Sequence, residues 1–164
     1  MARIPRPSRV AQIYREQLSS SRRERLFLSS VGFFSAFAIV RVITHAIRAG
    51  VGPFRNLSVG GRHLHHLVFG ILGLLGTGYL WLVQLGTGMR GCNDAGSRVT
   101  AMAYGAGSAI TLDEFALWLN LEDVYWARQG RESVDAVVLF GALLSIGLWG
   151  RPFFRELVRE ARRL

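Results

Sequence analysis

Long apolar blocks, separated by short polar stretches, dominate the pattern of this chain. Four of them reach or approach the length of a membrane-crossing helix, at residues 26–47, 64–85, 99–121 and 134–150. A membrane span needs roughly 20 mostly apolar residues, within a range of about 17–25. A soluble bundle would need polar stripes at helical spacing, and residues 71–85 and 137–148 have almost none. The pattern therefore predicts an all-α fold, a four-helix transmembrane bundle.

Basic segments flank this predicted transmembrane domain, residues 26–150, on both sides. Residues 1–25 carry seven Arg and two Glu, with apolar positions at helical spacing, and residues 151–164 show the same kind of pattern. Such a segment is typical of an amphipathic helix that lies on an anionic membrane surface. We expect one at each terminus, with a solvated charged tail as the alternative for the first.

Arginine supplies all of the basic charge, because the chain has no Lys and its net charge is +9. A basic chain can indicate nucleic-acid binding, but here the Arg cluster at the ends of the apolar blocks, as topology signals do. With four spans, 14 of the 20 Arg fall on the side of the two termini. We therefore predict a multi-pass protein of the plasma (inner) membrane, with both termini cytoplasmic and no nucleic-acid partner.

Two adjacent carboxylates, Asp113 and Glu114, interrupt the third apolar block. A charge at membrane depth costs at least about 2.5–3.5 kcal/mol, so it normally faces a partner, a cavity or the bundle interior. Steps of four residues lead from Ala101 through Gly105 and Ala109 to Asp113, and this row of small residues favours close helix packing. Asp113 is therefore expected on the packed face.

Arg41 lies inside the first block, about 10 Å from its outer end at 1.5 Å of rise per residue. In the predicted topology, Asp113 and Glu114 lie in the outer half of the third block at about the same depth. Opposite charges at one level predict an ion pair of Arg41 with Asp113 or Glu114. If Glu114 belongs to the histidine site described next, the structural ion pair is that of Arg41 and Asp113. Glu114 is then left without an arginine partner.

All four histidines gather at the same outer end of the predicted bundle. His45 is near the end of the first block, while His63 and His66 open the second block three residues apart. On a helix His63 and His66 would share one face, and His65 would point elsewhere. Imidazole and carboxylate together suit Zn, Mn or Fe. The hypothesis is a divalent metal site made by His45, His63, His66 and Glu114.

Several classes of function remain open for this site. A metal-dependent membrane enzyme would use Glu114 or Asp113 as the catalytic base for a metal-bound water. A b-type haem protein would use His45 and His66 as axial ligands. A non-catalytic assembly or partner protein, including a homo-oligomer, would use the polar residues only to hold the bundle. A proton or substrate relay is a further alternative.

No established catalytic motif decides between these classes. The chain has no HExxH, no GxSxG and no phosphate-binding glycine loop. Its single cysteine, Cys92, excludes an intramolecular disulfide and a Cys-based zinc site. The stretches GRHLHHLVFG, LDEFALWLNLEDVYW and GRESVDAV, within about residues 60–140, resemble small bacterial integral membrane proteins of four spans. No activity is assigned to that group, so the resemblance implies the membrane fold and adds no catalytic residue.

Overall fold

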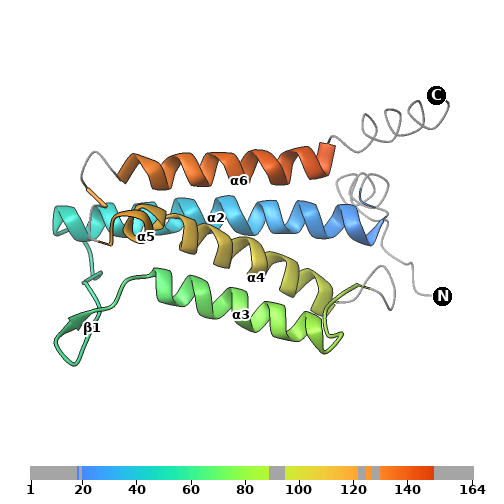
Figure 1. Cartoon of the computed structure of the whole chain (residues 1–164), viewed down its shortest axis with the longest axis horizontal. Coiled ribbons are helices and arrows are strands. Elements are labelled where there is room, and N and C mark those ends of the chain that lie inside the picture. Colours follow the sequence, from blue (N-terminus) through green and yellow to red (C-terminus); the bar gives the residue numbers. More distant parts are fainter. Residues whose placement is uncertain (1–17, 19, 89–94, 122–124, 127–129, 150–164) are drawn as a thin grey trace, which may run out of the picture.

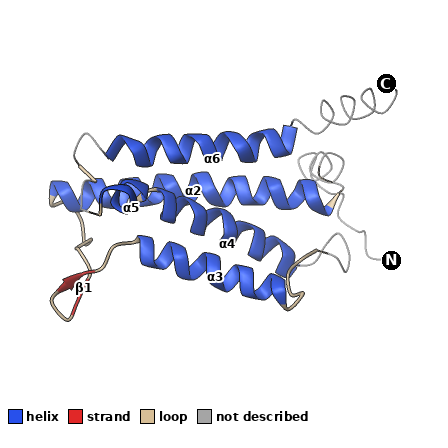
Figure 2. Ribbon diagram, viewed as in Figure 1, coloured by secondary structure: helices blue, strands red, loops and turns tan. Residues whose placement is uncertain are grey.

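A computed structural model describes residues 18, 20–88, 95–121, 125–126 and 130–149. The regular secondary structure of the described part is helical apart from one two-residue β ladder, with loops between the elements (Figure 2). The all-α class predicted from the sequence is therefore confirmed. The interfacial helix predicted within residues 151–164 lies outside the described residues. Residues 1–17 of the one predicted within residues 1–25 lie outside them as well.

The long helices run up and down in chain order (Figure 1). They are α2 (Ser21–Ala49), α3 (Leu67–Leu82), α4 (Ala95–Leu112) and α6 (Arg131–Trp149). A short helix, α5 (Phe115–Asn120), follows α4, and the strands β1 (Ser58–Val59) and β2 (Arg62–His63) pair antiparallel between α2 and α3. The end of α2 thus lies at the same end of the bundle as the starts of α3 and α6.

Helix α4 is the centre of the bundle, because it packs extensively on both α2 and α3 (Figure 1). Small residues permit this packing. A methyl group added at Gly105 would overlap the backbone carbonyl oxygen of Ser29, and one at Gly107 would lie 3.1 Å from the carbonyl oxygen of Gly70. Small residues at such positions let two helix backbones approach closely. The predicted row of small residues in α4 is therefore buried.

The apolar core is formed mainly by α2, α4 and α6. Phe33 is fully buried and packs in one cluster with Ala109, Val137 and Leu144. The ring of Phe33 also lies 5.4 Å from that of Phe140, measured between centroids. This cluster joins α6 to the rest of the bundle through aromatic and aliphatic contacts alone.

One described helix, α2, is long and apolar enough to cross a membrane, and it lies near the N-terminus. It has 29 residues. Helix α3 is also apolar but has only 16 residues. The structure thus gives one candidate membrane-spanning helix, and the remaining long helices overlap the other blocks predicted from the sequence.

The third predicted block is not one continuous helix. Helix α4 ends before Asp113, and α5 begins after Glu114, so the two acids form the turn between them. Glu114 has φ −109° and ψ 25°, outside the helical region. The break is stabilised from outside the block, because the Ala116 N–H donates to Ser133 Oγ at 2.9 Å. The expectation of an unbroken helix over 99–121 was therefore wrong.

The second predicted block begins later than expected. Helix α3 starts at Leu67, with His66 at the N-cap position. The preceding chain continues the β ladder, because the Leu64 N–H donates to the carbonyl oxygen of Leu57 at 2.8 Å. Residues 63–66 therefore do not follow helical spacing, and the argument that placed His63 and His66 on one helical face does not apply.

We expect Gly105→Ala to lower the free energy of unfolding by about 1–3 kcal/mol, the usual cost of overpacking. The reason is the overlap of the new methyl group with the Ser29 carbonyl. Gly76→Ala in α3 is the matched control, because nothing lies within 4 Å of a methyl group there. Denaturant unfolding of the purified chain in detergent measures both variants. Equal stability of the two would contradict the close approach of α2 and α4.

Candidate functional site

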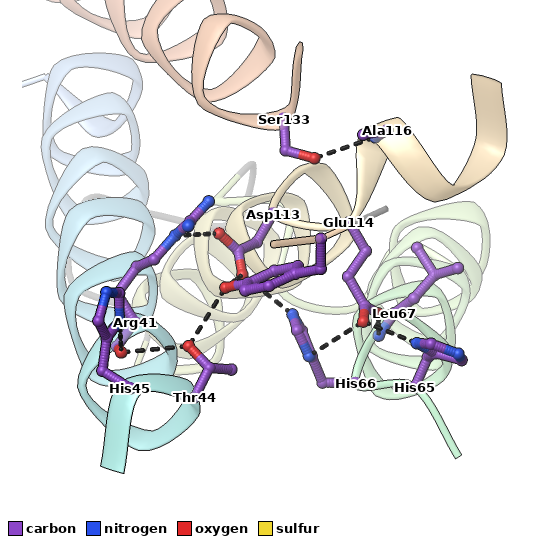
Figure 3. A network of polar contacts seen from close by, with 11 residues as sticks. Arg41, Thr44, His45, His65, His66, Leu67, Asp113, Glu114, Ala116 and Ser133 are labelled. Atoms are coloured by element: carbon purple, nitrogen blue, oxygen red, sulfur yellow. Dashed lines mark hydrogen bonds and ion pairs between the residues drawn. The ribbon is translucent and has the colours of Figure 1, made fainter. Parts of the chain in front are cut away.

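Asp113 is the most deeply buried charged residue in the described part of the chain, with 0% exposure. Its Oδ1 lies 2.6 Å from Nε of Arg41, which projects from α2 (Figure 3). The two atoms form an ion pair without the alignment of a hydrogen bond. The structure thus brings together the two residues for which the sequence predicted an ion pair.

Two further donors reach the other oxygen of Asp113. The Tyr125 hydroxyl donates to Oδ2 at 2.7 Å, and His66 Nε2 lies 3.1 Å from the same atom. Burial raises the pKa of the Tyr125 phenol, and the negative charge of Asp113 adds to this effect. Tyr125 therefore keeps its proton and donates a hydrogen bond to Asp113. The Tyr125 hydroxyl is also 3.2 Å from Thr44 Oγ1 on α2.

Glu114 supplies an acceptor for the start of α3. Its Oε2 accepts a hydrogen bond from the backbone N–H of Leu67 at 2.8 Å. The first N–H groups of a helix have no partner within the helix, and a negative charge is favourable there. The N-cap residue His66 makes no side-chain capping bond. The carboxylate from the α4–α5 turn therefore takes the place of a local cap.

His65 and His66 both meet Glu114 at its other oxygen. Oε1 lies 2.9 Å from His65 Nδ1 and 3.4 Å from His66 Nδ1, and Figure 3 shows both imidazoles on the Glu114 side. The expectation that His65 points elsewhere was therefore wrong. It assumed a helix, whereas neighbouring side chains in the turn before α3 can both reach α4.

His45 has different neighbours from the predicted ones. Its Nδ1–H donates to the Arg41 carbonyl oxygen at 2.8 Å, one turn back in α2. Its ring also lies 5.1 Å from that of Trp126, edge to face. The partners of the His45 ring are therefore its own helix, through the Arg41 carbonyl, and Trp126. The structure therefore does not bring His45 to His66 and Glu114.

The predicted metal site is consequently not assembled as proposed. His63 lies in β2, where its backbone pairs with Ser58, and the placement of its side chain is outside the described structure. Among the described residues, no group of three or more His, Cys, Asp and Glu is arranged to hold a metal ion. Of the predicted ligands, the structure brings His66 and Glu114 together, and it adds His65.

A cleft of about 540 Å³ opens beside the two imidazoles. Its apolar wall comes largely from α2, including Val40 and Ile43, and from Phe69 at the start of α3. Its polar lining consists of Arg48, Arg55, Asn56, His65, His66, Glu114, Thr44 and Tyr125. The cleft is therefore a space between α2 and α3, closed on one side by the polar network.

Sequence reasoning missed Tyr125, Thr44 and His65 as members of this network. Thr44 follows Arg41 by three residues, so shared helical spacing was an available signal for it. No spacing relates Tyr125 to Asp113, because the break at Glu114 and the whole of α5 lie between them. Comparison with protein-family models, with curated proteins and with solved structures finds no match to this chain.

We expect Arg41→Leu to reduce the free energy of unfolding by about 3–5 kcal/mol, because it leaves the buried Asp113 charge without its cation. Arg41→Leu combined with Asp113→Asn should recover part of this loss. Arg48→Leu on the same helix is the control, since Arg48 lies over the Trp126 ring at 4.3 Å and such exposed contacts contribute about 0.5–1 kcal/mol. Unfolding in detergent measures all three, and a double variant no more stable than the single one would refute the pair.

Proposed function

We propose that this chain is a four-span integral membrane protein whose outer end carries a His/carboxylate binding site. The four spans are supported by the surface of the bundle. Each long helix exposes large apolar side chains, among them Val42 at 67%, Leu75 at 65%, Val99 at 66% and Leu139 at 71% exposure. Soluble monomers rarely expose contiguous apolar patches larger than a few hundred Å². Lipid is the environment that would cover these side chains.

The short length of α3 is compatible with a span. Its 16 residues give about 24 Å of helix, against a hydrocarbon core of about 30 Å. The apolar surface continues past the helix end, where Val83 is 46% and Leu85 is 53% exposed. A short span is also accommodated by local thinning of the bilayer. The distribution of Arg then favours cytoplasmic termini.

The binding site is supported by one observation: His65, His66 and Glu114 line the cleft, and both imidazoles contact Glu114. Asp113 is fully buried behind them. It forms an ion pair with Arg41 and hydrogen bonds with Tyr125 and His66. The two acids therefore have different roles. Asp113 holds the helices together, and Glu114 fixes the imidazoles at the cleft wall, where a small polar ligand would meet them.

A divalent metal is the first ligand to test. Two imidazoles and one carboxylate form a common ligand set for Fe(II), and Zn and Mn also use these groups. The described side chains are not arranged to hold a metal ion, so His65, His66 and Glu114 would have to rearrange on binding. The Nδ1 atoms of His65 and His66 face the same oxygen of Glu114. An imidazole nitrogen that donates a hydrogen bond cannot ligate at the same time, so metal binding would replace these contacts.

The second candidate is a non-catalytic membrane partner protein with a purely structural network. It is favoured by the fact that both acids bond to other elements: Asp113 to α2 through Arg41, and Glu114 to α3 through the Leu67 N–H. A haem protein with His45 and His66 as axial ligands has less support, because His45 bonds to its own helix and does not line the cleft.

The proposed topology predicts that a reporter fused after Leu164 is active only on the cytoplasmic side. Inserted after Pro53, in the exposed segment between α2 and the β ladder, the same reporter should be active only on the outer side. The reason is the excess of Arg on the side of the termini. The proposal puts three spans between the two fusion points, so they must lie on opposite sides of the membrane. Activity of both fusions on the same side would refute it.

The metal hypothesis predicts stoichiometric Zn, Mn or Fe in protein purified without a His-tag, measured by elemental analysis. His66→Ala and His65→Ala should each lose the metal, because both imidazoles face Glu114. His45→Ala is the matched control and should keep the metal, since its ring bonds to Arg41 and Trp126 instead. Metal-free wild-type protein that is destabilised by His66→Ala would favour the structural network alone.

A further inference from the structure

A second pocket lies at the opposite end of the bundle from the polar network. It encloses about 390 Å³ between the start of α2, the end of α3, the start of α4 and the later part of α6. Apolar walls come from Leu26, Ala101, Tyr104 and Leu144. Its polar lining is Ser21, Arg22, Arg25, Ser29, Trp81 and Thr87. No carboxylate is present among its described lining residues, so the pocket offers cations and hydrogen-bond donors.

Two buried donors in this pocket have no hydrogen-bond partner among the described residues. They are the Ser29 hydroxyl and the Trp81 indole N–H. Ser29 is only 5% exposed. A buried polar group without a partner typically costs about 1–3 kcal/mol. The indole nitrogen can only donate, so the group that would satisfy Trp81 is an acceptor.

The surroundings of Trp81 hold both the ring and a cation in place. The Arg25 guanidinium lies 4.8 Å above the indole, and the Tyr104 ring packs against it at 5.3 Å between centroids. Arg25 also donates to the Thr87 carbonyl oxygen. The nearby acid Glu24 is ion-paired with Arg98 at 2.8 Å. The positive charge of Arg25 is therefore not matched by a described carboxylate at the pocket.

We propose that this pocket binds an anionic phospholipid. The phosphate lies at Arg22 and Arg25, and its oxygens or the ester oxygens accept from Trp81 and Ser29. The glycerol and upper acyl chain lie against the apolar walls. Basic pockets between membrane helices on the cytoplasmic side are recognised sites for anionic headgroups. The proposed topology places this end at the cytoplasmic leaflet, where such lipids are enriched.

The alternative occupant is a free phosphate compound, which would use the same Arg. Such a ligand leaves the apolar walls at Leu26 and Leu144 without contact. A phospholipid satisfies the charged, hydrogen-bonding and apolar parts of the pocket together. The chemistry of the pocket supports this inference independently of the outer site, and only the choice of leaflet rests on the proposed topology.

Fluorescence quenching tests the proposal, because Trp81 lines the pocket. The full chain in neutral detergent is titrated with brominated phosphatidylglycerol and, separately, with brominated phosphatidylcholine. We expect brominated phosphatidylglycerol to quench saturably at a concentration about fivefold or more below that of brominated phosphatidylcholine, because charge attraction to Arg favours the anionic lipid. Trp81→Phe should remove the saturable component. Equal quenching by the two lipids would overturn the proposal.

Matched variants locate the site. Arg25→Gln should weaken phosphatidylglycerol binding about fivefold, whereas Arg55→Gln, which removes the same charge at the outer cleft, should leave it unchanged. Ser29→Ala should weaken binding while the lipid-free protein keeps or gains stability, because an unpaired buried hydroxyl is removed. Ser29→Ala keeps the test decisive if Arg25→Gln does not fold. Equal loss from Arg25→Gln and Arg55→Gln, or displacement of the lipid by millimolar inorganic phosphate, would refute a lipid site.

Discussion

A carboxylate buried among apolar helices requires compensating groups at the place where it lies, and Asp113 imposes this requirement on the bundle. Arg41 reaches it from α2, Tyr125 from the segment after α5, and His66 from the start of α3. Each of these groups contacts Asp113 only if its own element stands at the right level. The ion pair and its hydrogen bonds therefore fix the relative heights of α2, α3 and α4 at this end.

The turn between α4 and α5 allows the two adjacent acids to serve different helices. Asp113 faces α2 through Arg41, whereas Glu114 accepts from the first N–H of α3. The N–H of Ala116, at the start of α5, finds its acceptor in Ser133 of α6. The starts of α3 and α5 thus each obtain an acceptor from another element. These two helix starts therefore do not depend on solvent for their first acceptors.

Periodicity predicted those parts of the molecule that lie within continuous helices. The positions of the long helices, the burial of Asp113 beyond a row of small residues and the reach of Arg41 to it all follow from 3.6-residue spacing and charge. The same reasoning failed for His65 and His45. His65 lies in a turn whose shape depends on the β ladder, and His45 finds closer partners in Arg41 and Trp126. Contacts of this kind are set by tertiary hydrogen bonds, which no local spacing encodes.

The two ends of the bundle differ in how their polar groups are satisfied. At the end that carries Asp113 and Glu114, the acids are paired with Arg41, His65 and His66, so a ligand in the cleft competes with existing contacts. At the opposite end, Ser29 and Trp81 have no described acceptor, so a ligand there supplies bonds that the described protein lacks. Binding in the cleft beside Glu114 therefore has to offset the loss of internal contacts. Binding at the other end would add hydrogen bonds without removing any described one, so a ligand there would stabilise the folded chain.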